Sequence, residues 1–271
     1  MQVNIMVAEF PGGWSNVQQS HPATNEWLRR TIVAMKSDER IKEIRPFCES
    51  GHYLPAVRNK ALKVARSNGI DMVLMIDSDM HPDLPYPDAK PFWGPSFDWM
   101  MNHWDRPGCI AAPYCGVPPL ENIYVFKWHS METDEPDVSP RLDQFSRDEA
   151  AIRGGISEVA ALPTGLIIID LRVLKVIDRS RFGIKSASKG YFHYELSPDN
   201  TEVHSTEDVV FTRNASLAGA PQWCNWDSWA GHYKIKCVGK PMPIRVEDVR
   251  EEYDRAERDR VSSNAKLVMV A

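Results

Sequence analysis

Residues 72–79 read Met-Val-Leu-Met-Ile-Asp-Ser-Asp, an apolar run that ends in two carboxylates separated by one residue. Such a run is typical of a strand that is buried on both faces of a parallel sheet. Asp77 and Asp79 would point the same way from its carboxyl end, where open α/β sheets bind their ligands. Two such carboxylates repel each other unless a cation lies between them, and oxygen ligands suit Mg²⁺ or Mn²⁺. The stretch therefore predicts a metal that holds a phosphorylated substrate; a simple turn is the alternative.

The sequence before this strand predicts two further strands, each followed by a helix. Residues 3–8 are the first expected strand and residues 44–48 the second. Apolar residues recur at helical spacing from Trp27 to Met35, and a second helix opens at Pro55 and stops at Asn68-Gly69. The order strand, helix, strand, helix, strand implies right-handed crossovers and a parallel sheet. The sequence thus predicts an α/β fold.

Shorter elements are expected after Asp79. The polar, charged residues 129–150 are typical of a mobile loop, and residues 246–261 predict a helix with a solvated charged face. Trp93, Trp99 and Trp104 can stack on a sugar or a base, but such residues more often belong to the core. The other expected elements are a helix at 97–104, strands at 109–114, 123–128 and 166–169, and a helix at 171–178.

The composition indicates a globular chain with no general attraction to polyanions. Its 271 residues, 43% of them hydrophobic, suffice for one large α/β domain or two small ones. With 32 basic and 37 acidic residues, the formal net charge of −5 does not favour nucleic acid or anionic membranes. The 5 cysteines include no Cys-x-x-Cys pair, which argues against a disulfide framework or a zinc site. Because no stretch approaches the roughly 20 apolar residues of a membrane span, we expect an unprocessed cytoplasmic protein.

Three further features add to the Asp-x-Asp signal. Arg58 is expected on the first turn of a helix, where a guanidinium can bind a carboxylate or phosphate in bidentate fashion. Glu207 and Asp208 are expected in the first turn of another helix, where acids also serve as ordinary capping residues. His232 can complete a Mn²⁺ site, although single histidines are usually structural. Each feature alone is open to the structural interpretation.

In this order and spacing, the residues resemble a nucleotide-sugar glycosyltransferase of the GT-A fold from about residue 3 to 240. The resemblance implies one α/β domain at residues 1–244, with a Rossmann-like mixed sheet flanked by helices. It also implies a nucleotide-binding half at about 1–115, an acceptor half at about 116–244, and a helical tail at 245–271. The corresponding pieces are Ala56-Val57-Arg58-Asn59, Ile76-Asp77-Ser78-Asp79-Met80, Pro163-Thr164-Gly165, Thr206-Glu207-Asp208 and Gly231-His232.

By this resemblance the protein would be a metal-dependent glycosyltransferase of the hexosyltransferase class. Asp79 and His232 would bind Mn²⁺ or Mg²⁺, and Asp77 would contact the ribose, or the metal through water. Asp208 would be the base that receives the acceptor's proton, with Glu207 as a hydrogen-bonding partner. A base opposite the departing diphosphate implies an inverting reaction, since it activates attack from the far face of the sugar.

The donor would be a nucleotide-diphosphate sugar, with a UDP-sugar favoured. The hydroxyl acceptor is open among glycans, lipid head groups, proteins, small metabolites and modified nucleic-acid bases. Arg58 would brace Asp77 or a phosphate, and Gly165 would let the backbone approach the sugar because glycine has no side chain. The other donor-binding positions would be Ala8, Glu9 and Phe10 at the end of the first strand, and Ser78 between the two aspartates.

Two other functions remain compatible with the sequence. A Mg²⁺-dependent phosphohydrolase of the aspartate-nucleophile type also uses Asp-x-Asp at a strand end. That class usually carries Thr or Val two residues after the second aspartate, where this chain has His81-Pro82. It also tends to place the motif on its first strand rather than its third. The other alternative is a non-catalytic module that binds a nucleotide or a sugar.

Overall fold

The first part of the chain folds as the sequence predicts. The computed structural model describes residues 1–11, 20–49, 53–116, 121–129, 141–183, 189–197, 202–233 and 237–238. Strand β1 lies between β2 and β3 and is parallel to both. The connecting helices α1 and α2 each have a proline in their first two positions, which suits a helix start. The bounds are β1 (Val3–Phe10), α1 (Pro22–Lys36), β2 (Ile41–Cys48), α2 (Leu54–Ser67) and β3 (Met72–Asp77).

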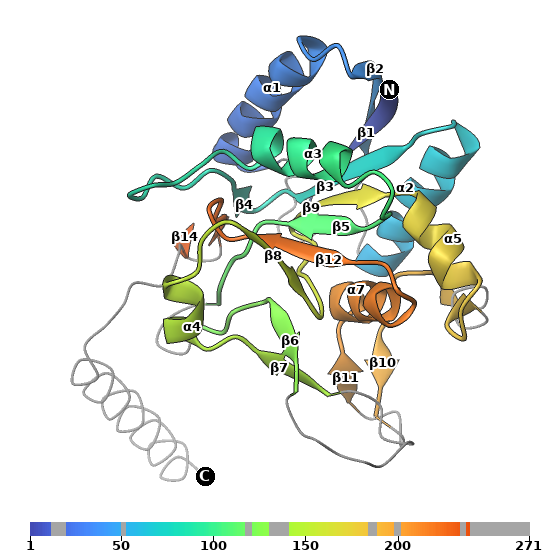
Figure 1. Ribbon diagram of the computed structural model, residues 1–271, viewed down its shortest axis with the longest axis vertical. Coiled ribbons are helices and arrows are strands. Elements are labelled where there is room, and N and C mark those ends of the chain that lie inside the picture. Colours follow the sequence, from blue (N-terminus) through green and yellow to red (C-terminus); the bar gives the residue numbers. More distant parts are fainter. Residues whose placement is uncertain are drawn as a thin grey trace, which may run out of the picture.

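The central sheet continues beyond β3 with strands of both directions. Strand β9 (Leu166–Asp170) pairs antiparallel with β3 on one side and with β5 (Cys109–Ala111) on the other. Strand β12 (Gln222–Asn225) is parallel to β5 and antiparallel to β8 (Ile156–Val159). The order across the 7-stranded sheet is β2-β1-β3-β9-β5-β12-β8. The expected mixed α/β sheet flanked by helices is confirmed (Figure 1).

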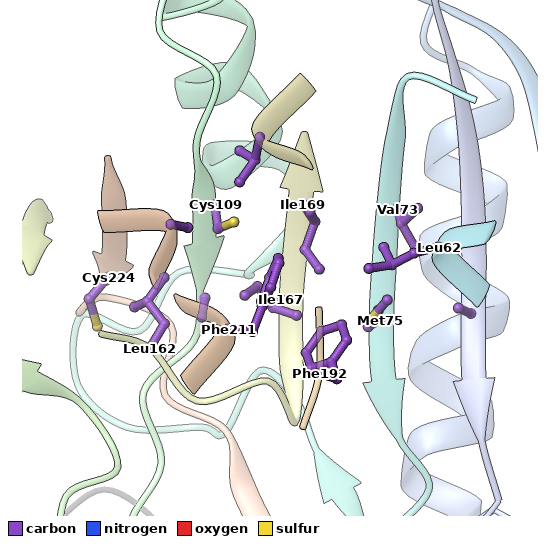
Figure 2. Close-up of a cluster of buried hydrophobic side chains, with 14 of the residues drawn as sticks. Leu62, Val73, Met75, Cys109, Leu162, Ile167, Ile169, Phe192, Phe211 and Cys224 are labelled. Carbon is purple, nitrogen blue, oxygen red and sulfur yellow. The ribbon is translucent and has the colours of Figure 1, made fainter. Parts of the chain in front are cut away.

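Strand β3 is buried on both faces because a separate core covers each face of the sheet. Met72, Leu74 and Ile76 belong to the core that α1 and α3 (Trp93–Asn102) cover. Val73 and Met75 belong to the other core, part of which Figure 2 shows. The helices over that second core are α2, α5 (Arg172–Asp178) and α7 (Glu207–Leu217). The apolar run before Asp77 is thus explained by two-sided burial.

Several expectations for the shorter elements need correction. Residues 130–140 of the expected loop at 129–150 lie outside the described residues, and the part from residue 141 on is not a loop, because it forms the strand β7 (Leu142–Gln144) and most of the helix α4 (Arg147–Ala151). The helix α4 starts at a capping box in which Ser146 and Glu149 exchange hydrogen bonds. The expected helix at 97–104 begins earlier, as α3, and the strands expected at 109–114 and 123–128 are shorter: β5 and β6 (Phe126–Trp128). The helix expected at 246–261 lies outside the described residues.

The remaining short strands lie beside the central sheet. Strand β6 pairs with β7, and β10 (Glu195–Leu196) pairs with β11 (Val203–Ser205). Strand β13 (Gly231–Tyr233) lies between β4 (Met80–His81) and β14 (Cys237–Val238). Trp93, Trp99 and Trp104 all pack on the core under α1 and α3. Within the described ranges, every helix is too short or too polar to cross a membrane.

We expect Ile168→Ala to lower the free energy of unfolding by about 2–5 kcal/mol, the usual range for a large-to-small change in a core. Ile168 is fully buried at the centre of β9. Urea denaturation followed by circular dichroism measures the change. Ile152→Ala is the matched control, because Ile152 is 83% exposed and its replacement should change stability by no more than about 0.5 kcal/mol. Equal effects of the two substitutions would contradict the two-core description.

Candidate functional site

The candidate site begins where β3 ends beside β1. Asp77, the last residue of β3, pairs with Phe10, the last residue of β1. The Asp77 amide donates to the Gly165 carbonyl at 2.9 Å, and the Ser78 amide donates to the Phe10 carbonyl at 3.3 Å. These bonds hold the Asp-x-Asp motif at the carboxyl edge of the sheet, the position that the sequence predicts for a ligand.

A distant segment brings His232 to this edge. Strand β13 pairs antiparallel with β4, so that His232 lies opposite Met80. The Tyr233 amide donates to the Asp79 carbonyl at 2.7 Å, which fixes the two segments together. As a result, His232 Nε2 lies 3.1 Å from Asp79 Oδ2. The structure therefore joins two of the three residues expected at the metal, 153 positions apart in the chain.

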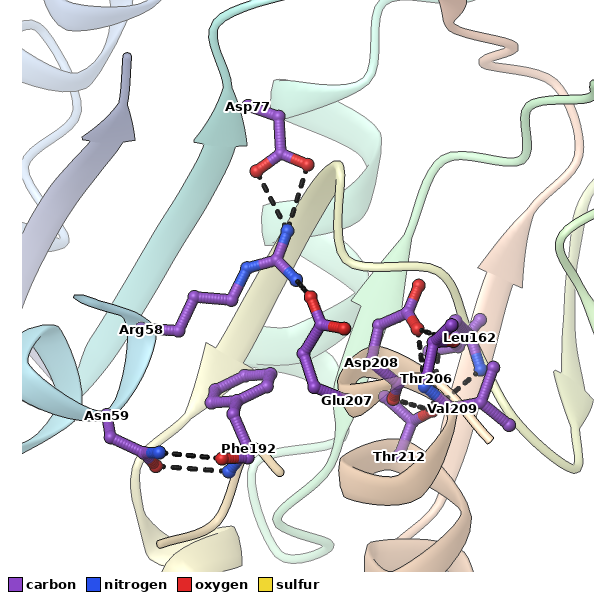
Figure 3. Close-up of polar contacts among 10 residues, drawn as sticks. All are labelled: Arg58, Asn59, Asp77, Leu162, Phe192, Thr206, Glu207, Asp208, Val209 and Thr212. Carbon is purple, nitrogen blue, oxygen red and sulfur yellow. Dashed lines mark hydrogen bonds and ion pairs between the residues drawn. The ribbon is translucent and has the colours of Figure 1, made fainter. Parts of the chain in front are cut away.

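Arg58 connects the partly buried carboxylate of Asp77 with the buried carboxylate of Glu207 (Figure 3). Its Nη2 atom donates to both oxygens of Asp77, at 2.8 and 2.9 Å. Its Nη1 atom donates to Glu207 Oε1 at 2.7 Å. Only 3% of the Arg58 side chain is exposed, so these bonds replace its contact with water. Because α2 begins at Leu54, Arg58 lies on the second turn of this helix. The prediction that it lies on the first turn is wrong.

The surroundings of Arg58 hold its guanidinium in place. The guanidinium carbon lies 5.9 Å from the ring centroid of Phe10 and 5.7 Å from that of Phe192, within the range of cation–π attraction. The side chain of Asn59 fixes Phe192 by donating to its carbonyl at 2.7 Å and accepting from its amide at 3.0 Å. Arg58 and Asn59, two successive residues of α2, thus contact the carboxylates of the candidate site and the backbone of Phe192, respectively.

Burial and the ion pairs of Arg58 shift the pKa values of these side chains in opposite directions. Burial raises the pKa of Asp77 above its ordinary value, and Arg58 counteracts that rise. The pKa of Glu207 is raised for the same reason, with Arg58 again opposing and Asp208 adding to the shift. Burial lowers the pKa of Arg58, but the charges of Asp77 and Glu207 outweigh burial and raise it. The guanidinium therefore stays charged and compensates two acids.

Asp208 lies beside this group in a different environment. Its Oδ1 atom accepts hydrogen bonds from the Thr206 hydroxyl and, at 2.8 Å, from the Val209 amide. Figure 3 shows its other oxygen directed away from these two donors. Asp208 is only partly buried, whereas Glu207 is 6% exposed. A partly exposed carboxylate that is oriented by its own helix start can accept a proton from a ligand.

Asp79 and His232 could together hold a metal ion that also binds the phosphates of a ligand. Among the described residues there is no cluster of three or more His, Cys, Asp or Glu side chains that could enclose an ion. Asp77 directs both oxygens to Arg58, which leaves Asp79 and His232 as the converging pair. Mg²⁺ is commonly held by one or two protein groups together with substrate phosphates and water. A carboxylate and an imidazole also suit Mn²⁺.

The expected donor-binding residues lie at the same edge, but not all expose a side chain there. Ala8 and Phe10 are buried in the core, so their side chains contact protein. Glu9 is partly exposed and accepts a hydrogen bond from Ser20. Ser78 is buried, and its carbonyl accepts from the His21 amide at 2.8 Å.

Gly165 is enclosed by side chains. A Cβ atom at Gly165 would lie 2.9 Å from Met80 Sδ and 3.0 Å from the Tyr114 hydroxyl. These distances are shorter than ordinary contacts, so a side chain would displace Met80 or Tyr114. Because glycine has no side chain, Met80 and Tyr114 can pack against the backbone at Gly165, whose carbonyl accepts from the Asp77 amide.

The structure adds residues that the sequence analysis did not single out. The Tyr233 ring stacks on His21 with centroids 3.5 Å apart and lies 5.6 Å from the His81 ring. Tyr114 packs against His232, with ring centroids 5.3 Å apart. Tyr114 ends the segment expected as a strand at 109–114, so the rule that ligands bind at carboxyl ends of strands could have identified it. The Tyr233 stack combines three separate segments and carries no local signal.

Comparisons with known proteins assign neither a family nor an activity to this chain. No protein-family model and no curated protein matches it. Protein A197 from STIV superimposes with a TM-score of 0.47 at 12% identity, covering 90% of this chain and 97% of that one. A structure of GalNAc-T7 with UDP, GalNAc and Mn²⁺ gives 0.43 at 11%, covering 86% and 44%. Apo UDP-glucose pyrophosphorylase gives 0.42 at 10%, covering 94% and 99%.

We expect Arg58→Met to reduce the free energy of unfolding by about 3–5 kcal/mol, because it leaves the buried Glu207 and the partly buried Asp77 without their cation. Adding Glu207→Gln to this variant should restore part of the loss. Urea denaturation of the single and double variants measures both effects. Arg29→Met is the control: 69% of the Arg29 side chain is exposed in its ion pair with Glu26, so about 0–1 kcal/mol is expected. A loss for Arg58→Met no larger than that of the control would show that Arg58 is not the cation that holds the site together.

Proposed function

We propose that this protein is a metal-dependent glycosyltransferase that moves a sugar from a nucleotide-diphosphate sugar to a hydroxyl acceptor. The observation that carries the proposal is the convergence of Asp79 and His232, 3.1 Å apart, at the carboxyl edge of the sheet. Asp77, two residues before Asp79, is joined through Arg58 to Glu207, the residue before Asp208. A metal ion that compensates the diphosphate and a carboxylate that accepts a proton are two functions that transfer from a sugar diphosphate can use.

In this proposal each part of the site has a separate task. Asp79 and His232 would hold a divalent cation, which would supply positive charge for the departing diphosphate. Arg58 keeps Asp77 fixed next to Asp79, so that the Asp-x-Asp segment presents one carboxylate to the cation and the other to the guanidinium. A UDP-sugar is the favoured donor, and the acceptor is a hydroxyl-bearing molecule of unspecified class.

Asp208 is the proposed base for the acceptor hydroxyl. Glu207 suits this role less well, because Arg58 occupies its Oε1 and only 7% of its side chain is exposed. Asp208 keeps one oxygen away from its Thr206 and Val209 donors (Figure 3). A base that receives the proton while the diphosphate leaves from the opposite face gives inversion at the anomeric carbon.

Product analysis separates this proposal from the two alternatives. The protein is incubated with Mn²⁺ and UDP-glucose, UDP-N-acetylglucosamine or GDP-mannose, and with p-nitrophenyl phosphate in parallel. Release of nucleoside diphosphate and free sugar supports a transferase that uses water in place of its acceptor. Release of phosphate from the monoester would indicate a phosphohydrolase, in which Asp77 would have to attack although both of its oxygens are bound by Arg58. Binding without turnover would indicate a binding module.

We expect Asp79→Asn to abolish the metal-dependent binding of UDP, because the substitution removes the negatively charged oxygen ligand. With wild-type protein and Mn²⁺, UDP at 100 times its dissociation constant should stabilise the fold by roughly 2.7 kcal/mol, and EDTA should remove this gain. A thermal-shift titration measures both effects. Asp105→Asn, at an exposed position, is the control and should behave as wild type. Undiminished Mn²⁺-dependent stabilisation of Asp79→Asn would contradict the metal assignment.

We expect Asp208→Asn to retain donor binding while transfer or sugar hydrolysis falls by about 10²- to 10⁴-fold, the usual effect of losing a general base. Asparagine preserves the shape of the side chain and its oxygen acceptor but lacks the basicity. Steady-state kinetics measures the rate, and nuclear magnetic resonance of the product determines the anomeric configuration. A wild-type rate, or retention of configuration, would mean that Asp208 only starts the helix or orients the acceptor.

A further inference from the structure

Tyr114 is a buried tyrosine at the carboxyl edge of the sheet, and the proposed function assigns it no role. It follows β5, which runs parallel to β3 because β9 pairs antiparallel with both. Its carbonyl accepts from the Tyr124 amide at 3.1 Å, and the preceding Pro113 carbonyl accepts from the Ala230 amide at 3.0 Å. The side chain is therefore held on a fixed backbone and is 7% exposed.

The ring of Tyr114 rests against the proposed metal ligand. It meets the His232 ring edge to face, with centroids 5.3 Å apart and an interplanar angle of 68°. On another side it contacts Tyr124, also with a centroid distance of 5.3 Å. The hydroxyl end lies over Gly165, where an added Cβ atom would approach it to 3.0 Å. The Tyr114 ring thus lies against His232, and its hydroxyl lies beside the Gly165 backbone, which is hydrogen-bonded to the Asp77 amide.

The charged residues that act on the Tyr114 hydroxyl are the proposed functional residues. They are the carboxylates of Asp208, Asp77 and Asp79 and the guanidinium of Arg58. Burial, followed by the Asp208 charge, raises the pKa of Tyr114 well above its ordinary value. A tyrosine hydroxyl can both donate and accept a hydrogen bond.

We propose that the Tyr114 hydroxyl donates a hydrogen bond to the sugar of the nucleotide-sugar donor and is a specificity-determining contact of this site. This inference rests on the proposed function. A sugar that leaves a diphosphate at Asp79 and His232 and accepts attack from the side of Asp208 must lie between these residues. The Tyr114 ring contacts His232, and its hydroxyl lies at Gly165, whose carbonyl accepts from the Asp77 amide, so the hydroxyl lies beside the proposed metal ligand and the Asp-x-Asp segment, where such a sugar would bind.

The test compares the binding of UDP with that of UDP-glucose and UDP-N-acetylglucosamine, in the presence of Mn²⁺, by isothermal titration calorimetry. Tyr114→Phe keeps the ring contacts with His232 and Tyr124 and removes only the hydroxyl. Its affinity for the UDP-sugar should fall by about 2- to 12-fold, the effect of one lost hydrogen bond, while its affinity for UDP stays unchanged. Tyr191→Phe is the matched control, because the Tyr191 hydroxyl bonds to Asp178 and Arg66 in an exposed ion-pair group. It should leave both affinities unchanged.

Gly165→Ala gives a second, independent measurement. Its methyl group would press on Met80 and on the Tyr114 hydroxyl. It should therefore weaken UDP-sugar binding in the wild-type background and have a smaller effect in the Tyr114→Phe background, where the hydroxyl is already absent. Equal losses for UDP and UDP-sugar in Tyr114→Phe, or no loss for either, would overturn the inference while leaving the proposed function intact. If wild-type protein binds UDP but no UDP-sugar, or binds neither, both the proposed function and this inference fail.

Discussion

The ion pairs of Arg58 are the interaction on which the candidate site depends. One guanidinium binds both oxygens of Asp77 and one oxygen of Glu207, and almost no water reaches it. Without this cation, the buried Glu207 and the partly buried Asp77 would have no compensating charge, which is among the more costly situations in a protein. The two acids come from a central strand and from the start of α7. The same three side chains therefore tie the helix α7 to the β3 end of the sheet.

This arrangement assigns different chemistry to four acids that lie close together. Asp77 and Glu207 share one cation, Arg58, and serve to fix geometry. Asp79 is paired with His232, and 39% of its side chain is exposed, more than for Asp77 or Glu207. Asp208 depends on hydrogen bonds from its own helix start. Differences in burial and in partner, rather than in residue type, separate a structural carboxylate from one that can bind a metal or receive a proton.

Local patterns predict much of the fold, since each depends on short-range chemistry. The apolar run before Asp77 is a strand buried on both faces, and the prolines near the starts of α1 and α2 suit helix beginnings. The capping box at Ser146 and Glu149 is also a local signal, which the polar composition of residues 129–150 concealed. The antiparallel entry of β9 between β3 and β5 could not be read from the sequence, because an apolar strand has the same pattern in either direction.

Sequence patterns predict that Asp77 and Asp79 follow a buried strand, and that Arg58, Glu207, Asp208 and His232 belong to elements that could approach it. Which of these residues meet depends on the three-dimensional fold. Arg58 contacts Glu207 across 149 positions, and His232 contacts Asp79 across 153. The pairing of β4 with β13 and the packing of α2 against the segment around Phe192 create those contacts. Local chemistry sets what a residue can do, whereas its partners follow from the sheet order and the burial of two cores, which are properties of the whole chain.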